Sequence, residues 1–187
     1  NVNIDTSSAA IATSGKGNVN IELDGTNTLK SGRYHAGLEK SQDGKLTITD
    51  ENANGKLIAT GGQYGAGIGG GFYEGGKNIT IAGGKVTANG GDYGAGIGGG
   101  QEGDGSNITI TGGEVTAAGG TNGAGIGGGG GISGKGEKIS ISGDAALKVQ
   151  GGLTDEWDGA GAGIGNGGRH NGDTGSFIPV NGAETEP

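Results

Sequence analysis

A seven-residue glycine segment recurs in this chain at a fixed interval. The segment Gly65-Ala66-Gly67-Ile68-Gly69-Gly70-Gly71 returns unchanged at 94–100 and at 123–129, a step of 29 residues each time, and a variant with one Asn occupies 161–167. A constant period of this length indicates stacked structural units in place of one globular core. The composition agrees, because 52 of the 187 residues are Gly and only 29% are hydrophobic, which leaves little material for a conventional core.

Each repeat contains three short apolar stretches, which predict three strands. The first stretch, Ile79-Thr80-Ile81, alternates as a strand with one buried face does; the second is Val86-Thr87-Ala88 and the third is Ala66-Gly67-Ile68. Copies of the first occur at 108–110, 139–141, 46–48, 19–21 and 2–4, copies of the second at 115–117, 57–59 and 147–149, and copies of the third at 95–97, 124–126, 162–164 and 36–38. Gly pairs such as Gly61-Gly62 follow the second strand, and we expect them to turn the chain at a corner that needs positive φ.

These strands predict an all-β fold, a right-handed single-stranded parallel β-helix (β-solenoid) of about five to six coils with three short strands in each coil. Coils stacked about 4.8 Å apart would place inward Ile, Val and Ala residues in ladders. We expect one β-helix domain over 1–182, with irregular N-terminal coils (1–45), regular repeats (46–137) and a last coil with insertions (138–182). Phe177-Ile178-Pro179-Val180 is expected to form the final edge strand, and 183–187 a linker or tail.

Charge and composition exclude several function classes. The net charge of −8 without a basic run argues against binding to nucleic acid or to an anionic membrane. The absence of Cys excludes a thiolate metal site, and no apolar run is long enough to span a bilayer. Because the chain starts at Asn1 and shows no signal peptide, we expect a mature fragment or an excised module that is joined to other domains of a larger chain.

The repeat pattern Asn-Ile-Thr-Ile-x-Gly-Gly-x-Val-Thr-Ala-x-Gly-Gly-x-x-Gly-Ala-Gly-Ile-Gly-Gly-Gly resembles glycine-rich parallel β-helix repeat modules in large cell-surface proteins of gut Firmicutes. Those modules are often labelled carbohydrate-binding or adhesin-like. The stretch Asp24–Leu29 is similar to their N-terminal coils, and the resemblance extends over nearly the whole chain. It implies a Gram-positive, extracellular module that is secreted or attached to the cell wall, with a cell-surface or dietary glycan, or a host surface glycoprotein, as its partner. It supplies no catalytic residues.

A column of tyrosines is the first candidate ligand site. Tyr34, Tyr64 and Tyr93 stand two residues before the Ala of the third stretch in successive coils, and the next coil has Asn122 there. At the spacing of the coils, the three rings would stack into a surface stripe. A row of aromatic platforms suits a chain of sugars, whereas a stack that only stabilises the corner is the alternative interpretation.

The insertions in the last coil form the second candidate site. The first insertion holds the single Trp157 beside Asp155, Glu156 and Asp158, and Arg169 lies in the second insertion. Trp157, Asp155, Asp158 and Arg169 could bind a sugar, with the acids accepting hydrogen bonds from hydroxyl groups. Asp155, Glu156 and Asp158 are also weak candidates for Ca²⁺, because that ion prefers several oxygen ligands. Otherwise we expect no cofactor. The alternative interpretation is a C-terminal cap that covers the last coil.

The distribution of charged residues argues against catalysis. Residues 41–152 contain no Arg that could act as a lyase base, and their acids differ from coil to coil, so no pair of carboxylates recurs in the repeats. We therefore expect a non-catalytic glycan-binding module of a surface adhesin or modular enzyme, or, as the alternative, a structural stalk. Ice binding through outward Thr residues and polysaccharide lyase activity are the less favoured functions, because Thr suits exposed strand positions in any case.

Overall fold

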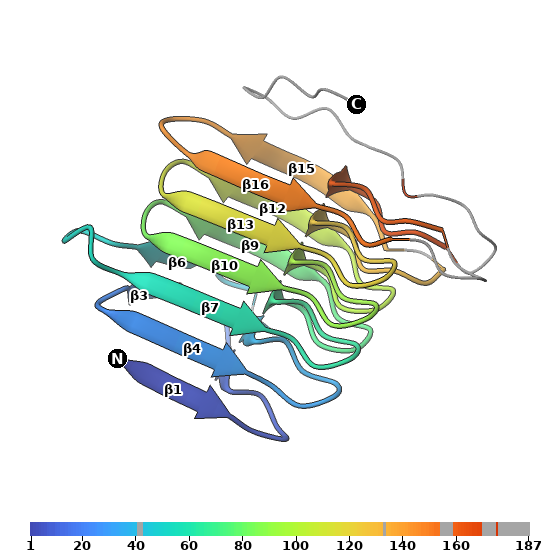
Figure 1. The fold of residues 1–187 in the computed structure, drawn as a ribbon, viewed down its shortest axis with the longest axis horizontal. Coiled ribbons are helices and arrows are strands. Elements are labelled where there is room, and N and C mark those ends of the chain that lie inside the picture. Colours follow the sequence, from blue (N-terminus) through green and yellow to red (C-terminus); the bar gives the residue numbers. More distant parts are fainter. Residues whose placement is uncertain (41–42, 133, 154–158, 170–174, 176–187) are drawn as a thin grey trace.

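In the computed structural model, residues 1–40, 43–132, 134–153, 159–169 and 175 are described, and they form an all-β structure. No helix occurs among these residues, and therefore none that is long and apolar enough to cross a membrane. The strands build three parallel sheets that run along the stack of coils (Figure 1). The predicted parallel β-solenoid is thus confirmed.

Each of the first five coils contributes one strand to each sheet, and the last coil contributes strands to the first two sheets within the described residues. The first sheet contains β1 (Val2–Asp5), β4 (Thr26–Lys30), β7 (Lys56–Thr60), β10 (Lys85–Asn89), β13 (Glu114–Ala118) and β16 (Ala146–Gln150). The second contains β2 (Ile11–Thr13), β5 (Leu38–Lys40), β8 (Ile68–Gly69), β11 (Ile97–Gly98), β14 (Ile126–Gly127) and β17 (Ile164–Gly165). The third contains β3 (Val19–Glu22), β6 (Leu46–Thr49), β9 (Gly76–Ile81), β12 (Gly105–Ile110) and β15 (Gly136–Ile141).

The core consists of ladders of identical or similar side chains that point into the coil. In the second sheet Leu38, Ile68, Ile97 and Ile126 lie in register and are fully buried. In the third sheet the ladder runs through Leu46, Ile79, Ile108 and Ile139. Outward residues such as Thr47 and Thr109 are more exposed than these neighbours, as expected of strands with one buried face. Very few apolar residues therefore suffice, since each one packs against its copies above and below.

The assignment of the first strand was wrong. The alternation of Val2-Asn3-Ile4 predicts a strand of the third sheet, but β1 pairs with β4 in the first sheet, with Val2 opposite Asn27 and Ile4 opposite Leu29. Both sheets use the same alternation of apolar and polar residues, so the pattern alone cannot separate them. The strands β2 and β4 were not predicted, because the sequences of Ile11–Thr13 and Thr26–Lys30 differ from the corresponding strands of the regular repeat.

The glycine pairs after the second predicted strand have a role different from the one expected. Gly62, Gly91 and Gly120 do not adopt positive φ. They lie one above another, and a Cβ at each would overlap the carbonyl oxygen of the glycine one coil earlier, which is Gly32 for Gly62, Gly62 for Gly91 and Gly91 for Gly120. Glycine is required here because backbones of successive coils approach too closely for any side chain.

Candidate functional site

The predicted tyrosine stack forms at the corner between the first and second sheets. The rings of Tyr34 and Tyr64 stack with centroids 5.6 Å apart and planes at 24°, and those of Tyr64 and Tyr93 stack at 5.8 Å and 22°. A backbone hydrogen bond joins the successive copies, because Tyr64 N–H donates to the carbonyl of Arg33, and Tyr93 N–H donates to that of Gln63. The regular period of the chain therefore places the three rings in one column.

Two further aromatic residues, Phe72 and Tyr73, extend this column sideways. Phe72 N–H donates to the Tyr34 carbonyl at 2.8 Å, which holds the Phe72 ring 5.5 Å from Tyr34 and 5.1 Å from Tyr64. The Tyr73 ring lies 3.9 Å from Phe72 and is the most exposed of the five, at 61%. We call Tyr34, Tyr64, Tyr93, Phe72 and Tyr73 the aromatic cluster; it contains every aromatic residue in the described part of the chain.

The stacking of the rings changes which tyrosines can bind a ligand. Tyr64 has Tyr34 on one side and Tyr93 on the other, so neither face is open to a sugar, and the ring is only partly exposed. The predicted platform Tyr64 therefore has its ring faces covered by its neighbours, since rings stacked at the coil spacing cover one another. Tyr34, at the end of the column, is 48% exposed. Tyr73 was missed by sequence reasoning because it has no copy in other repeats.

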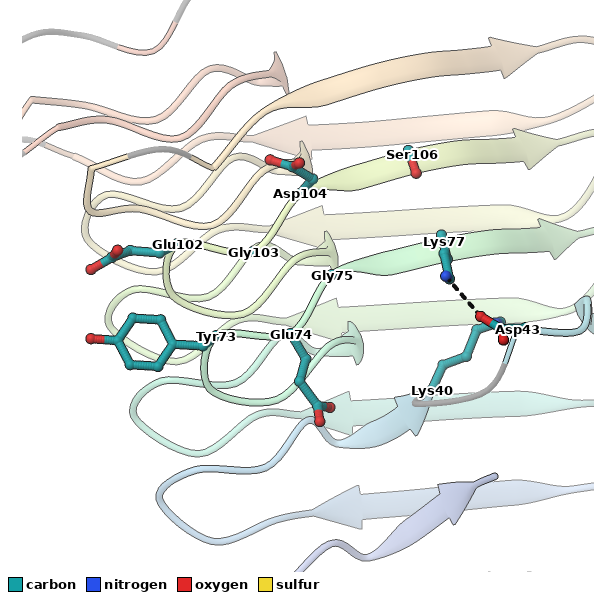
Figure 2. Close-up of a pocket in the computed structure, with 10 residues that line it drawn as sticks. All are labelled: Lys40, Asp43, Tyr73, Glu74, Gly75, Lys77, Glu102, Gly103, Asp104 and Ser106. Carbon is teal, nitrogen blue, oxygen red and sulfur yellow. Dashed lines mark ion pairs between the residues drawn. The ribbon is translucent and has the colours of Figure 1, made fainter. Parts of the chain in front are cut away.

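Tyr73 begins a second column that follows the outer edge of the loops between the second and third sheets. Tyr73 N–H donates to the carbonyl of Gln101, Glu102 N–H to that of Gly130, and Gly131 N–H to that of Gly168, so Tyr73, Glu102, Gly131 and Arg169 occupy equivalent positions in successive coils. We call these four residues the outer column. Figure 2 shows the Tyr73 and Glu102 side chains projecting to the same side, away from the strands. The predicted site residue Arg169 is exposed and lies at the far end of this column.

Tyr73 and Glu102 adopt strained backbone conformations. Their φ values are 61° and 59°, in the left-handed region that is unfavourable for bulky residues, and the equivalent residue of the next coil is Gly131, at 122°. In two of three coils a large side chain therefore stands at a position where glycine would fit, and the left-handed backbone conformation destabilises the fold by about 1–2 kcal/mol per residue. Strain of this kind clusters at ligand-binding sites.

A groove of about 480 Å³ lies between the outer column and the third sheet. It is lined by Lys40 and Asp43 of one coil, by Tyr73, Glu74, Gly75 and Lys77 of the next, and by Glu102, Gly103, Asp104 and Ser106 of the third (Figure 2). The groove therefore combines one exposed aromatic ring with four carboxylates, a hydroxyl and two amines, of which that of Lys40 is buried. Such groups can exchange hydrogen bonds with the hydroxyl groups of a polar ligand.

The groove lies where a short coil meets longer ones. The chain needs 11 residues from Ile68 to Ile79 but only eight between their register partners Leu38 and Leu46. At the start of the shorter connection Glu39 replaces the regular Gly69, and its Oε2 accepts the Ala36 N–H at 3.1 Å and contacts His35 Nδ1 at 2.9 Å. This carboxylate substitutes for the Gly70 carbonyl that accepts the equivalent Ala66 N–H. The short connection leaves the residues around Tyr73 without a loop of equal length beside them.

Opposite charges meet at the floor of the groove. Lys77 Nζ lies 2.9 Å from Asp43 Oδ1, and this hydrogen bond and charge lower the pKa of the Asp43 carboxyl. Lys40 is 1% exposed, and its burial, together with the neighbouring Lys77 ammonium, lowers the pKa of its amine. Figure 2 shows both lysine side chains pointing toward Asp43. These charges offset one another, whereas Glu74 and Asp104 make the other side of the groove acidic.

The ion pair at the groove floor yields a pH prediction. Replacing Lys77 with Gln should raise the pKa of Asp43 toward its ordinary value, because the two largest causes of the shift, the hydrogen bond and the charge of Lys77, are lost. The pair stabilises the fold at neutral pH, and this stabilisation disappears as the pH falls through the lowered pKa. The effect on stability will be small, since both side chains are at least half exposed. Carboxyl-carbon NMR titration measures the shift, and Lys85→Gln is the control: it should change Glu114 and leave Asp43 unaltered.

Asn122 does not serve as a surface contact. It continues the tyrosine column, with its N–H donating to the Asp92 carbonyl, but its side chain is fully buried and its Nδ2 donates to the Gly159 carbonyl at 3.4 Å. This predicted ligand-binding residue is therefore covered by the last coil and does not reach the surface. Trp157, Asp155, Glu156 and Asp158 lie outside the described residues, as does the expected edge strand Phe177–Val180.

The arrangement suits reversible binding of a polar ligand on an aromatic and charged surface. Within the part of the chain that the structure describes, no three His, Asp or Glu residues are placed to hold a metal ion. The outward Thr residues of the third sheet share their face with Asn78 and Asn107, whose amides are hydrogen-bonded to each other at 2.6 Å, so they do not form a uniform array.

The comparisons with known proteins agree with the fold. A family model described as a beta helix repeat matches residues 53–72, 79–101 and 108–130, which are the three most regular coils. The comparisons with curated proteins and with solved structures give no match. The matched segments and the three parallel sheets both support a β-helix repeat architecture.

Proposed function

We propose that this β-helix repeat domain is a non-catalytic glycan-binding module of an extracellular bacterial surface protein or modular enzyme. The observation that carries the proposal is the exposed Tyr73 ring, held in a strained conformation at the mouth of an acid-lined groove. An aromatic ring with flanking carboxylates and amines is the combination that binds a sugar, because the ring covers its apolar C–H face and the polar groups bind its hydroxyls. A cell-surface or dietary glycan, or a host glycoprotein, is the proposed partner.

The Tyr73→Gly variant tests this function without disturbing the fold. Glycine accepts the φ of 61° at no cost, which compensates for the lost contact with Phe72, so we expect the unfolding free energy to stay within about 1 kcal/mol of the wild type. Glycan binding should fall by about tenfold or more, as for other exposed aromatic anchors. A printed glycan array followed by titration calorimetry on its hits measures the change.

The matched control is Val2→Ala, which truncates an exposed apolar side chain, 42% accessible, in β1 at the N-terminal end of the stack. It should bind every glycan as the wild type does. Equal binding by Tyr73→Gly and wild type, or a wild type that binds no glycan on the array, would overturn the proposal.

A structural stalk is the second candidate, and the tyrosine stack favours it. Rings that cover one another stabilise neighbouring coils, and aromatic pairs of this kind contribute about 0.5–1.5 kcal/mol beyond their buried area. A stalk requires the stack but not the strained and exposed Tyr73. Absence of any glycan binding by a fully folded wild-type domain would therefore favour the stalk.

A further inference from the structure

Arg33, beside the tyrosine stack, is held in one orientation by the rings. Its guanidinium carbon lies 5.4 Å from the centroid of Tyr34 and 5.1 Å from that of Tyr64. Its Nη2 donates a hydrogen bond to the Tyr64 hydroxyl at 2.9 Å. Contacts with the two rings and one hydrogen bond orient the planar guanidinium, so its other N–H groups can bind a ligand with little further loss of side-chain freedom.

The charge of Arg33 is exposed and is not neutralised by a carboxylate among the described residues. The ion pairs of that part of the chain use Asp5, Glu39, Asp43 and Glu114, and none of them involves Arg33. Its immediate partners are the two tyrosines, and its equivalent in the next coil is the neutral Gln63. A fixed and unpaired guanidinium in a chain with a net charge of −8 is well suited to bind an anionic group, because its fork of N–H donors matches a carboxylate.

The aromatic cluster connects Arg33 to the groove. The contacts run from Arg33 to Tyr34, from Tyr34 to Phe72 at 5.5 Å, and from Phe72 to Tyr73 at 3.9 Å, and Tyr73 lines the groove. The surface is therefore cationic at one end, aromatic in the middle and acidic at the other end, where Glu74 and Asp104 lie. A ligand that carries negative charge along its whole length would be repelled at the acidic end.

We propose that the ligand is a glycan with a single carboxylate near one end, namely a neutral oligosaccharide capped by one acidic sugar. The carboxylate pairs with Arg33, and the neutral sugars lie over Phe72 and Tyr73 toward the groove. Arg33 is thereby a specificity-determining residue, and Tyr64 is a positioning residue that orients it through its hydroxyl. This inference rests on the proposed glycan-binding function and adds to it the chemical class of the ligand.

The test is a glycan array printed with four classes of probe: neutral oligosaccharides, the same oligosaccharides capped with sialic or hexuronic acid, the methyl esters of these capped glycans, and oligogalacturonates. We expect the capped glycans to bind about tenfold more tightly than their methyl esters and their neutral parents, because only they offer a charge-assisted pair to Arg33. Oligogalacturonates should bind more weakly than the singly capped glycans.

Variants separate the contributions of charge and geometry. Arg33→Gln should remove the tenfold preference for the carboxylate and keep binding to the neutral parents, whereas Lys30→Gln, which removes an exposed cation paired with Asp5, should preserve the preference. Arg33→Lys keeps the charge but not the planar fork, so it should lose most of the preference. Tyr64→Phe keeps the stack and should reduce the preference partially, since only the orienting hydroxyl is lost.

The outcomes distinguish this inference from the function on which it rests. Binding of neutral glycans as strong as that of capped ones, or a carboxylate preference that survives in Arg33→Gln, would overturn the inference and leave glycan binding intact. Preferred binding of oligogalacturonates would also overturn the inference, because the acidic residues of the groove would then not repel a ligand with a carboxylate on every sugar. No binding to any glycan would overturn both proposals.

Discussion

Replacing Gly120 with alanine is expected to lower the unfolding free energy by at least about 3 kcal/mol, a fall of roughly 10 °C in the melting temperature. The Cβ would overlap the carbonyl oxygen of Gly91 one coil earlier, and the neighbouring Asp92 backbone lies close as well. Because the obstacle is backbone in the adjacent coil, no side-chain rotation can relieve it, and the two coils must separate. Each coil contacts only its neighbours, so the loss divides the stack in the middle.

The control for Gly120→Ala is Gly17→Ala, in the N-terminal coils. An added Cβ at Gly17 meets no atom within 4 Å, and the residue does not have positive φ, so we expect a change of no more than about 0.5 kcal/mol. Thermal melts followed by circular dichroism, together with urea titrations, measure both variants. Equal stability of Gly120→Ala and wild type would contradict the close approach of the coils.

Replacing Ile108 with alanine should cost about 2–5 kcal/mol of unfolding free energy. Ile108 is fully buried in the third sheet, between Ile79 of the preceding coil and Ile139 of the following one. Each coil supplies a single side chain at this ladder position, so the substitution leaves a cavity between the neighbouring isoleucines. The coils cannot move together to fill it without breaking their hydrogen-bonded register. We therefore expect a value in the upper half of the range.

Ile132→Ala removes the same atoms from a side chain that is 63% exposed and should change the unfolding free energy by no more than about 0.5 kcal/mol. Urea titrations of the two variants measure the difference. A cost for Ile108→Ala as small as that for Ile132→Ala would mean that the ladder does not carry the stability of the stack.

The regular coils were predictable because each of their residues has copies at one fixed interval. The ladder of Ile68, Ile97 and Ile126 and the column of Tyr34, Tyr64 and Tyr93 both follow from the period and the strand spacing. The register of β1 was not predictable, since its alternation fits two sheets equally well and only closure of the first coil selects between them.

The candidate site was predictable only in part, because it lies where the repeat is broken. Phe72 and Tyr73 have no copies in other coils, and their approach to Tyr34 depends on a backbone hydrogen bond between segments 38 residues apart in sequence. Likewise, the sequence around Asn122 does not indicate that the last coil buries its side chain. Positions without copies acquire their neighbours only when the coils are stacked.

The sequence by itself determined the architecture of this protein: a period of 29 residues with three apolar stretches leaves a stack of three-stranded coils as the arrangement that buries them. Only the tertiary structure decided which exposed groups meet. It turned the faces of the tyrosines against one another, brought Arg33 over two of the rings, and opened the groove beside Tyr73. The physical reason is that burial is encoded locally by alternation, whereas contacts between coils depend on loop lengths and on register across the whole stack.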